Sequence, residues 1–250
     1  MTVRKMQEKR GWAFWLAVSI VKPVLLCFTR RTWVHMERIP LRGGFVVALN
    51  HISHADPLTA AHLLYDSGRL PRYLAKAGLW KIGWLRLVMD GAGQIPVERD
   101  SRGADAYAAA VRAIGDGKAI VVYPEATITR DPDMWPMKGK SGAARIALET
   151  GCPVIPVGQW GAHELLPPYT KRPRLLPRRR IVMRVGEPVQ LEDLRGRQQT
   201  PEVVAEASER IMAAITRELE QIRGEKAPQH RWDMKVDGDR FAKAKSGEKK

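Results

Sequence analysis

Asn50-His51-Ile52-Ser53-His54-Ala55-Asp56-Pro57 joins two elements of different periodicity. Residues 44–49 consist of a glycine and five apolar residues and predict a buried strand. The proline at position 57 predicts the first turn of a helix. A turn from a strand to a helix exposes its side chains at the sheet edge where α/β enzymes keep their chemistry. We therefore expect His51 and Asp56 to lie at a functional edge of an α/β sheet.

His51 and Asp56 are candidates for a general base and the residue that orients it. A neutral imidazole takes a proton from a substrate hydroxyl, and a carboxylate on the far ring nitrogen fixes the tautomer and stabilises the imidazolium. The alternative is structural, because aspartate followed by proline is also an ordinary helix cap with a first-turn proline. The spacing alone leaves both interpretations open.

Three further segments predict strands that end near polar groups or in the core. Gly93-Gln94-Ile95-Pro96-Val97-Glu98-Arg99 predicts a short strand ending in an arginine, whose guanidinium is a fork of donors suited to a phosphate. Residues 119–127 predict an apolar strand that delivers Glu125 into a loop. Val154-Ile155-Pro156-Val157 predicts a buried strand with its proline near a sheet edge or strand end. The alternatives are a surface arginine, a solvated glutamate and ordinary core packing.

In this order and spacing, the four segments resemble the glycerophosphate acyltransferase superfamily, specifically the bacterial 1-acylglycerol-3-phosphate acyltransferases. The resemblance covers residues 33–188. It implies that Asn-His-x4-Asp supplies the catalytic histidine and aspartate, that the arginine of Gly-x-Ile-Pro-Val-x-Arg binds the acceptor phosphate, and that Phe-Pro-Glu-Gly-Thr contributes to acceptor binding. The residues that match these positions are His51, Asp56, Arg99, Glu125 and Thr127.

The third of these blocks departs from the family pattern at two positions. Ala126 stands where the family usually has glycine, which matters if the backbone there needs a positive φ or a close approach to a ligand. Ile128 replaces a frequent arginine, so we expect one phosphate contact to be missing unless another base supplies it. The candidates for that replacement are Arg130, Lys138 and Lys140. Both departures bear on the acceptor more than on the reaction.

The chain alternates between strand and helix patterns, which predicts a mixed, mostly parallel α/β sheet flanked by helices. The expected strands lie near residues 33–38, 44–49, 72–76, 94–98, 119–124, 154–159 and 180–186. The expected helices lie near residues 57–67, 78–90, 102–116, 140–150 and 201–223. With 250 residues the chain is long enough to bury a full core. We expect an acyltransferase domain at 33–224, between an N-terminal helical segment at 1–32 and a basic, flexible tail at 225–250.

The N-terminal segment is apolar but interrupted. Residues 12–21 form an apolar run that Lys22-Pro23 separates from residues 24–28, so the run is shorter than the roughly twenty residues of a spanning helix. We expect one or two short amphipathic helices in the membrane interface, and no signal peptide. The residues expected at the headgroups are Trp12, Trp15 and Trp33, with Arg4, Lys5, Lys9 and Arg10 toward anionic lipid. The alternative is a helix packed on the protein's own core.

The net charge of +15 favours the cytoplasmic face of the cell membrane, with the protein held there as a peripheral or monotopic protein. Residues 171–180 concentrate six of the 42 basic residues. Each base near an anionic leaflet contributes about 1 kcal/mol. The same run is suited to the phosphates of coenzyme A or to an acidic carrier protein. The sequence contains no recognisable nucleic-acid module, so we expect no nucleic-acid partner.

Two other kinds of site are conceivable, a metal site and a nucleophilic serine. His51, His54 and Asp56 offer metal-ligand atoms, but no further cluster with suitable spacing accompanies them, and we expect no metal. Ser53 and Ser141 are conceivable nucleophiles, but neither lies in a Gly-x-Ser-x-Gly elbow. We therefore expect a reaction without an acyl-enzyme.

The resemblance implies transfer of a fatty acyl group from an acyl thioester to the free sn-2 hydroxyl of 1-acylglycerol 3-phosphate, giving phosphatidic acid. His51 is then the base, Asp56 orients it, and acyl-CoA or acyl carrier protein is the co-substrate, with no cofactor. The expected partners are a lysophosphatidate-type acceptor, this acyl donor and an anionic membrane surface. Two alternatives stay open: the same transfer onto glycerol 3-phosphate or a membrane glycolipid, and a non-catalytic membrane-binding relative.

Overall fold

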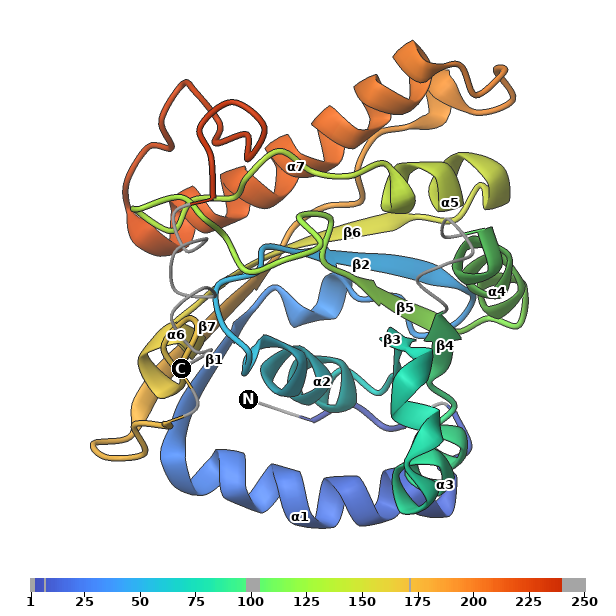
Figure 1. The fold of residues 1–250 in the computed structure, drawn as a ribbon. Helices are drawn as coiled ribbons and strands as arrows, with labels where there is room; N and C mark the ends of the chain where they lie inside the picture. Colours follow the sequence, from blue (N-terminus) through green and yellow to red (C-terminus); the bar gives the residue numbers. More distant parts are fainter. Residues whose placement is uncertain (1–2, 7, 98–103, 171, 240–250) are drawn as a thin grey trace, which may run out of the picture.

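The computed structural model describes residues 3–6, 8–97, 104–170 and 172–239 (Figure 1). These residues form a seven-stranded sheet in the order β1-β7-β6-β2-β5-β3-β4. The strands are β1 (Thr29–Val34), β2 (Phe45–Leu49), β3 (Pro71–Lys76), β4 (Ile95–Val97), β5 (Ala119–Val122), β6 (Val154–Trp160) and β7 (Arg179–Val185). The strands from β2 to β6 are parallel, whereas β7 runs antiparallel to β6 and carries β1 parallel to itself. The predicted mixed, mostly parallel sheet is confirmed.

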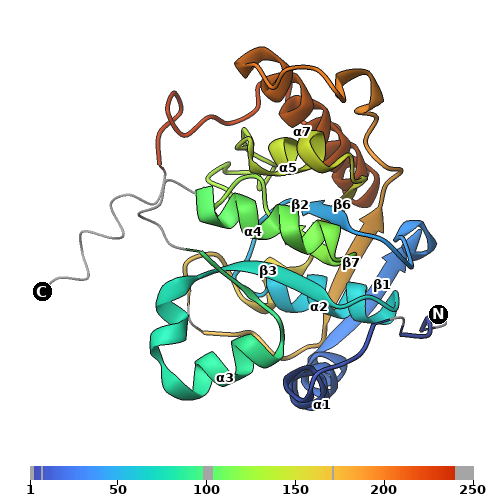
Figure 2. The ribbon, with the colours of Figure 1, turned by 90° about the vertical axis from the view of Figure 1, so that its right-hand side faces the viewer.

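Helices cover both faces of this sheet (Figures 1 and 2). They are α1 (Trp12–Phe28), α2 (Asp56–Asp66), α3 (Gly83–Gly91), α4 (Ala104–Gly115), α5 (Gly142–Thr150), α6 (Ala162–Leu165) and α7 (Pro201–Arg223), with 3₁₀ turns at Met36–Arg38, Ala77–Lys81 and Glu192–Leu194. One face carries α4, α5 and α7, and the other carries α2 and α6. α1 lies beyond α2 as an outer layer.

The central strand β2 fixes the two cores. All five of its residues are buried, with Val46 and Ala48 in the core under α4, α5 and α7. Phe45, Val47 and Leu49 lie in the core under α2. A strand buried on both faces requires the continuous apolar run from which it was predicted.

The first strand begins earlier than the predicted range of 33–38, which is wrong in position. α1 ends at Phe28 and the chain passes directly into β1. His35 then takes a left-handed conformation, with φ of 56°, and a 3₁₀ turn follows. The left-handed residue ends the extended run because strand pairing needs β-region dihedrals.

α1 is one continuous helix of 17 residues, so of the one or two helices expected here a single helix forms, with Pro23 inside it. An internal proline removes one helical hydrogen bond and costs about 3 kcal/mol. The helix persists because tertiary contacts hold it: Phe14 and Leu25 are buried, and Lys22 Nζ donates to the Asp66 carboxylate at 2.7 Å. None of the described helices combines the length and the hydropathy needed to cross a bilayer.

Two side chains expected at a lipid headgroup layer are engaged within the protein, so these expectations are wrong. Trp33 is only 8% exposed and donates its Nε1–H to Asp66, the carboxylate that also binds Lys22. Arg4 donates to the backbone carbonyl of Ile39 at 2.9 Å. Asp66 thus fastens α1 and β1 to α2, because a buried carboxylate needs several donors.

Candidate active site

His51 and Asp56 lie at one edge of the sheet, in the turn from β2 into α2. β2 is the central strand and is flanked by the parallel strands β5 and β6. The C-terminal ends of all three strands therefore meet at this turn. Asn50 joins two of them, because its side-chain amide bonds the backbone N–H and carbonyl of Gln159 in β6 at 2.8 and 3.1 Å.

The side chains of His51 and Asp56 contact each other directly. Nδ1 of His51 lies 2.8 Å from Oδ2 of Asp56. Because a carboxylate only accepts hydrogen bonds, Nδ1 carries the ring proton and Nε2 keeps the lone pair that a base needs. The His51 side chain is 16% exposed and that of Asp56 is fully buried. This is the arrangement of a general base and its orienting carboxylate.

Asp56 does not cap α2 through its side chain, so the helix-cap interpretation of this residue is wrong. Its Oδ2 also accepts the backbone N–H groups of Ile52 and Ser53, at 2.6 and 2.8 Å, and both precede the helix. The N-cap is Ala55, without a side-chain hydrogen bond. Burial raises the pKa of Asp56 above its ordinary value, and the bond with His51 opposes that rise. The three N–H donors on Oδ2 favour the ionised form, whereas Oδ1 is buried without a hydrogen-bond partner among the described residues.

Glu125 holds the turn of His51 and Asp56 from the side of β5. Its Oε1 accepts the backbone N–H of His51 at 2.8 Å, and its Oε2 accepts that of Met137 at 2.9 Å. The N–H of Thr129 donates to the His51 carbonyl at 2.8 Å. Burial raises the pKa of Glu125 to about 8, against the effect of the two amides. Both oxygens are thus engaged by backbone N–H groups, and Glu125 holds the turn that carries His51.

Tyr123 sets an aromatic ring against the imidazole of His51. The two ring centroids are 4.4 Å apart, and the ring planes are inclined by 27°. Tyr123 directly follows β5, and it also lines an apolar cavity. The candidate base and the cavity therefore have a side chain in common.

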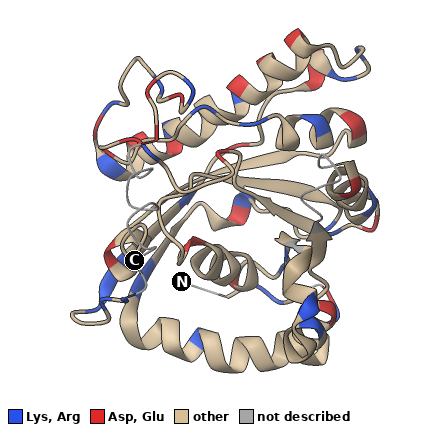
Figure 3. Ribbon diagram, viewed as in Figure 1, with Lys and Arg blue, Asp and Glu red and all other residues tan. Residues whose placement is uncertain are grey.

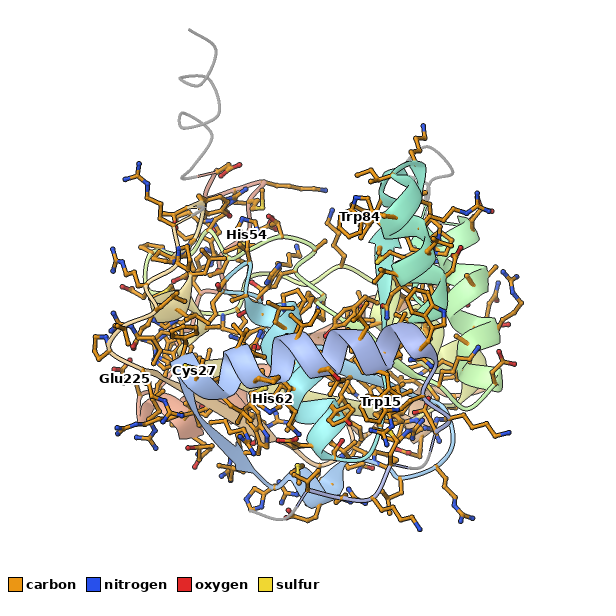
Figure 4. The ribbon with its side chains drawn as sticks, turned by 90° about the horizontal axis from the view of Figure 1, so that it is seen from below. Trp15, Cys27, His54, His62, Trp84 and Glu225 are labelled. Carbon is orange, nitrogen blue, oxygen red and sulfur yellow. The ribbon has the colours of Figure 1, made fainter. Side chains whose placement is uncertain are left out.

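The cavity has a volume of about 570 Å³ and lies between α1, α2, α3 and β3. Its lining is mainly apolar and includes Val18, Leu25, Leu58, Leu74 and Met89. Figure 4 shows α1 running across this side of the molecule, and the residues of its inner side close the cavity. A cavity of this size and lining suits a hydrocarbon chain.

The three bases suggested as substitutes for a missing phosphate contact have separate surroundings. Arg130 is 3% exposed, and its Nε lies 2.9 Å from the carboxylate of Asp239. Lys138 Nζ lies 3.0 Å from the carboxylate of Asp233, and Lys140 is exposed. Both carboxylates belong to the segment after residue 224, whose described part, 225–239, thus contacts the loop between β5 and α5. The domain boundaries themselves stay a prediction.

Arg130 is linked through Tyr169 to the turn between β2 and α2. Its guanidinium lies 4.4 Å from the centre of the Tyr169 ring, and that ring meets His54 edge-on with centroids 6.3 Å apart. The Tyr169 hydroxyl donates to the carbonyl of Ile128 at 2.9 Å. The Ile128 side chain is buried, so this position offers a phosphate no charged group.

Ala126, at the position of the family's glycine, has φ of 60°. This left-handed conformation favours glycine, because a Cβ atom crowds the following carbonyl. The neighbouring Thr127 is half-buried. The left-handed backbone at this position explains why the family has glycine here. With alanine, this chain carries strain in the turn that leads out of β5.

Replacing Ala126 with glycine is expected to raise the free energy of unfolding by about 0.5–1 kcal/mol. Relief of the left-handed strain, about 1–2 kcal/mol, exceeds the entropy that glycine adds to the unfolded chain. Urea unfolding with an unchanged m-value measures the difference. The control is Ala205→Gly on the exposed side of α7, which should lose about 1 kcal/mol. Equal destabilisation by both changes would contradict the strain.

Arg99, the predicted phosphate-binding arginine, lies outside the described residues, two positions after β4 ends at Val97. Tyr123 had no predicted role, although an aromatic residue between an apolar strand and a proline is a sign of a residue at the strand end near the site. It also missed Asp233 and Asp239, for which the local sequence offers no signal.

Comparison with known proteins bears on these predictions. A family model described as Acyltransferase matches residues 30–160. A protein of Borreliella burgdorferi named 1-acyl-sn-glycerol-3-phosphate acyltransferase is 32% identical over 123 residues, which are 48% of this chain and 47% of that protein. The chloroplastic 1-acyl-sn-glycerol-3-phosphate acyltransferase BAT2 of Brassica napus is 29% identical over 124 residues, which are 49% of this chain and 34% of that one. The aligned part thus spans about half the length of the first relative and about a third of the second.

The fold is similar to that of a solved structure. The crystal structure of the 1-acyl-sn-glycerophosphate (LPA) acyltransferase PlsC from Thermotoga maritima superposes with a TM-score of 0.59, covering 84% of this chain and 82% of that one. The sequence identity is 23%. At this identity the likeness supports the architecture of the sheet and its helices.

Proposed function

Because this chain belongs to the acyltransferase family, we propose that it transfers a fatty acyl group from a thioester to the free sn-2 hydroxyl of 1-acylglycerol 3-phosphate. The observation that carries this proposal is the 2.8 Å contact between His51 Nδ1 and the buried Asp56 carboxylate. The names of the two relatives, both 1-acyl-sn-glycerol-3-phosphate acyltransferases, support this choice of acceptor. The product is phosphatidic acid, so the protein is assigned to phospholipid biosynthesis.

His51 acts as general base in this proposal. Its Nε2 removes the proton of the acceptor hydroxyl while the oxygen attacks the thioester carbonyl carbon. The carbon–sulfur bond then breaks, and the thiolate of coenzyme A or acyl carrier protein leaves. The imidazolium gives its proton to this thiolate, which returns His51 to its neutral form. Asp56 keeps Nδ1 protonated and stabilises the imidazolium between these steps. The acyl group passes directly from donor to acceptor, without an acyl-enzyme.

The acyl chain of the donor is proposed to occupy the 570 Å³ cavity. Its apolar walls gain about 0.8 kcal/mol for each methylene removed from water. Tyr123 lies both on the cavity and against His51, so a chain that fills the cavity brings its carbonyl end toward the base.

The acceptor phosphate is proposed to bind Arg99, as the family pattern implies. Arg130 and Lys138 face the carboxylates of Asp239 and Asp233, which a phosphate would have to replace. These two bases, with Thr127 and Lys140, are therefore proposed as secondary contacts. Guanidinium suits this role because its fork of donors matches phosphate oxygens.

The acceptor is tested by supplying one labelled donor, palmitoyl-CoA, with a panel of acceptors in vesicles: lysophosphatidate, glycerol 3-phosphate and a membrane glycolipid. Label in phosphatidic acid supports the proposed function. Label in another lipid would support acyl transfer as the reaction but would show a different acceptor. No transfer from palmitoyl-CoA or palmitoyl carrier protein would favour a membrane-binding protein without this activity.

The outer side of α1 is proposed to rest on the cytoplasmic leaflet of the membrane. Trp12, Trp15, Leu16, Ile20 and Val24 are each at least 48% exposed there and recur at helical spacing. α1 is almost free of charged residues along its length (Figure 3), while basic residues stand at both of its ends. An apolar helix side between basic ends suits the interface of an anionic bilayer.

Changing Trp15 and Ile20 together to glutamate is expected to weaken vesicle binding at least tenfold. Each buried side chain contributes roughly 1.5–3 kcal/mol, and each new charge opposes the anionic surface. Co-sedimentation with vesicles containing phosphatidylglycerol measures the change. The control is Val236→Glu, because Val236 is 78% exposed in the C-terminal segment, away from α1. Equal loss in both variants, or no loss in the first, would contradict docking through α1.

A further inference from the structure

Tyr123 is the residue shared by the candidate base and the acyl-chain cavity. One contact is its stack on His51, with centroids 4.4 Å apart and planes inclined by 27°. The other is its place in the wall of the 570 Å³ cavity. Because Tyr123 contacts both, a chain bound in the cavity can change how Tyr123 packs on the His51 ring.

The stack limits how the imidazole moves. Asp56 fixes the ring at Nδ1, which leaves rotation about the Cβ–Cγ bond opposed by one hydrogen bond. A ring lying nearly parallel to the imidazole blocks that rotation on one side through van der Waals contact. Tyr123 and Asp56 together therefore define the plane in which Nε2 points.

Tyr123 is itself held by backbone and core. It directly follows β5 and is succeeded by Pro124, whose fixed φ restricts the chain. Its hydroxyl is buried and interacts with the side chain of Gln159 in β6. The ring also lines the cavity, so a chain bound there adds packing contacts to it.

We propose that Tyr123 is a positioning residue that couples occupancy of the acyl-chain cavity to the orientation of His51. A chain that reaches Tyr123 packs the phenol ring against the imidazole, and Nε2 is then held on the line of the acceptor hydroxyl. A short chain leaves the ring unsupported. Binding energy from the chain is thereby used for the chemical step and appears in kcat as well as in KM. This coupling rests on the proposed function.

The enzyme test compares acyl-CoA donors from octanoyl to palmitoyl, with lysophosphatidate vesicles as acceptor. In the wild type, kcat should rise with chain length until the cavity is filled. Tyr123→Leu should lower kcat for palmitoyl-CoA by about tenfold and remove that rise, because the flat ring is lost. Tyr123→Phe should restore the rise, since it keeps the ring and removes only the buried hydroxyl.

Val18→Ala is the matched control for cavity volume. Val18 lines the cavity from α1, on a different element from Tyr123. Its truncation should raise KM for long donors and keep the rise of kcat. Loss of the rise in Val18→Ala as well would show that cavity packing alone is responsible, and a preserved rise in Tyr123→Leu would equally overturn the coupling.

A second measurement does not need turnover. The ring ¹⁵N signals of His51 in the full chain are recorded with and without a palmitoyl-CoA thioether, which cannot transfer its chain. The signals should shift and sharpen in the wild type and in Tyr123→Phe, and should not respond in Tyr123→Leu. Absent transfer in the wild type would remove the proposed function, whereas an unresponsive His51 in a binding wild type would remove the coupling alone.

Discussion

His51→Ala is expected to lower kcat for acyl transfer by about 10² to 10⁴-fold and to leave the fold intact. The lost group is the one whose Nε2 removes the acceptor proton, and alanine offers no other base. The Asp56 carboxylate keeps the backbone N–H groups of Ile52 and Ser53 as donors in this variant, so the turn should hold. Initial rates with saturating palmitoyl-CoA and lysophosphatidate measure the effect, and thermal unfolding checks the fold.

His54→Ala is the matched control for this change. His54 lies in the same turn, is exposed, and meets only the edge of Tyr169 among the ring contacts of the described residues. Its removal should change kcat by less than about threefold. Equal losses in the two variants would point to damage of the turn, and a fully active His51→Ala would remove His51 from the mechanism.

Asp56→Asn should lower kcat on the order of 10³-fold. Oδ2 of Asp56 accepts from His51 and from the backbone amides of Ile52 and Ser53. The amide oxygen of asparagine can still accept some of these hydrogen bonds. However, the amide is neutral and cannot stabilise the imidazolium. It also allows the ring to take the tautomer with the proton on Nε2, which is not a base.

The same variant should also be less stable, because a buried N–H group that loses its acceptor costs roughly 1–3 kcal/mol. Denaturant unfolding therefore accompanies the rate measurement. The activity loss should far exceed the fraction of unfolded protein at the assay temperature. An Asp56→Asn enzyme whose activity falls only in proportion to its unfolding would reduce Asp56 to a structural residue.

Local periodicity predicted most of the sheet. β2 is buried on both faces, and its apolar run has the length of a strand between a glycine pair and the His51 turn. The position of β1 and the continuity of α1 were not readable in this way. Both depend on Asp66, which binds Lys22 and Trp33 from distant segments. A break signal such as Lys22-Pro23 is overridden when tertiary contacts hold both sides of it.

The candidate site divides in the same manner. The spacing of His51 and Asp56 lies within one turn, and their contact follows from the path of that turn alone. The stack of Tyr123 on His51 depends on β5 lying beside β2, and strand order is not written in either segment. The two hydrogen bonds of Glu125 to backbone N–H groups also depend on how the strands and loops pack. Its position at a strand end in the sequence does not predict them.

The most direct test of acyl transfer to the acceptor with His51 as the base is the stoichiometry of one reaction. The full chain is mixed with labelled palmitoyl-CoA and lysophosphatidate vesicles, and free coenzyme A and phosphatidic acid are counted together, with and without His51. The account predicts one phosphatidic acid for each coenzyme A released, and loss of both products in His51→Ala. Release of coenzyme A without a lipid product, or transfer that survives in His51→Ala, would contradict it.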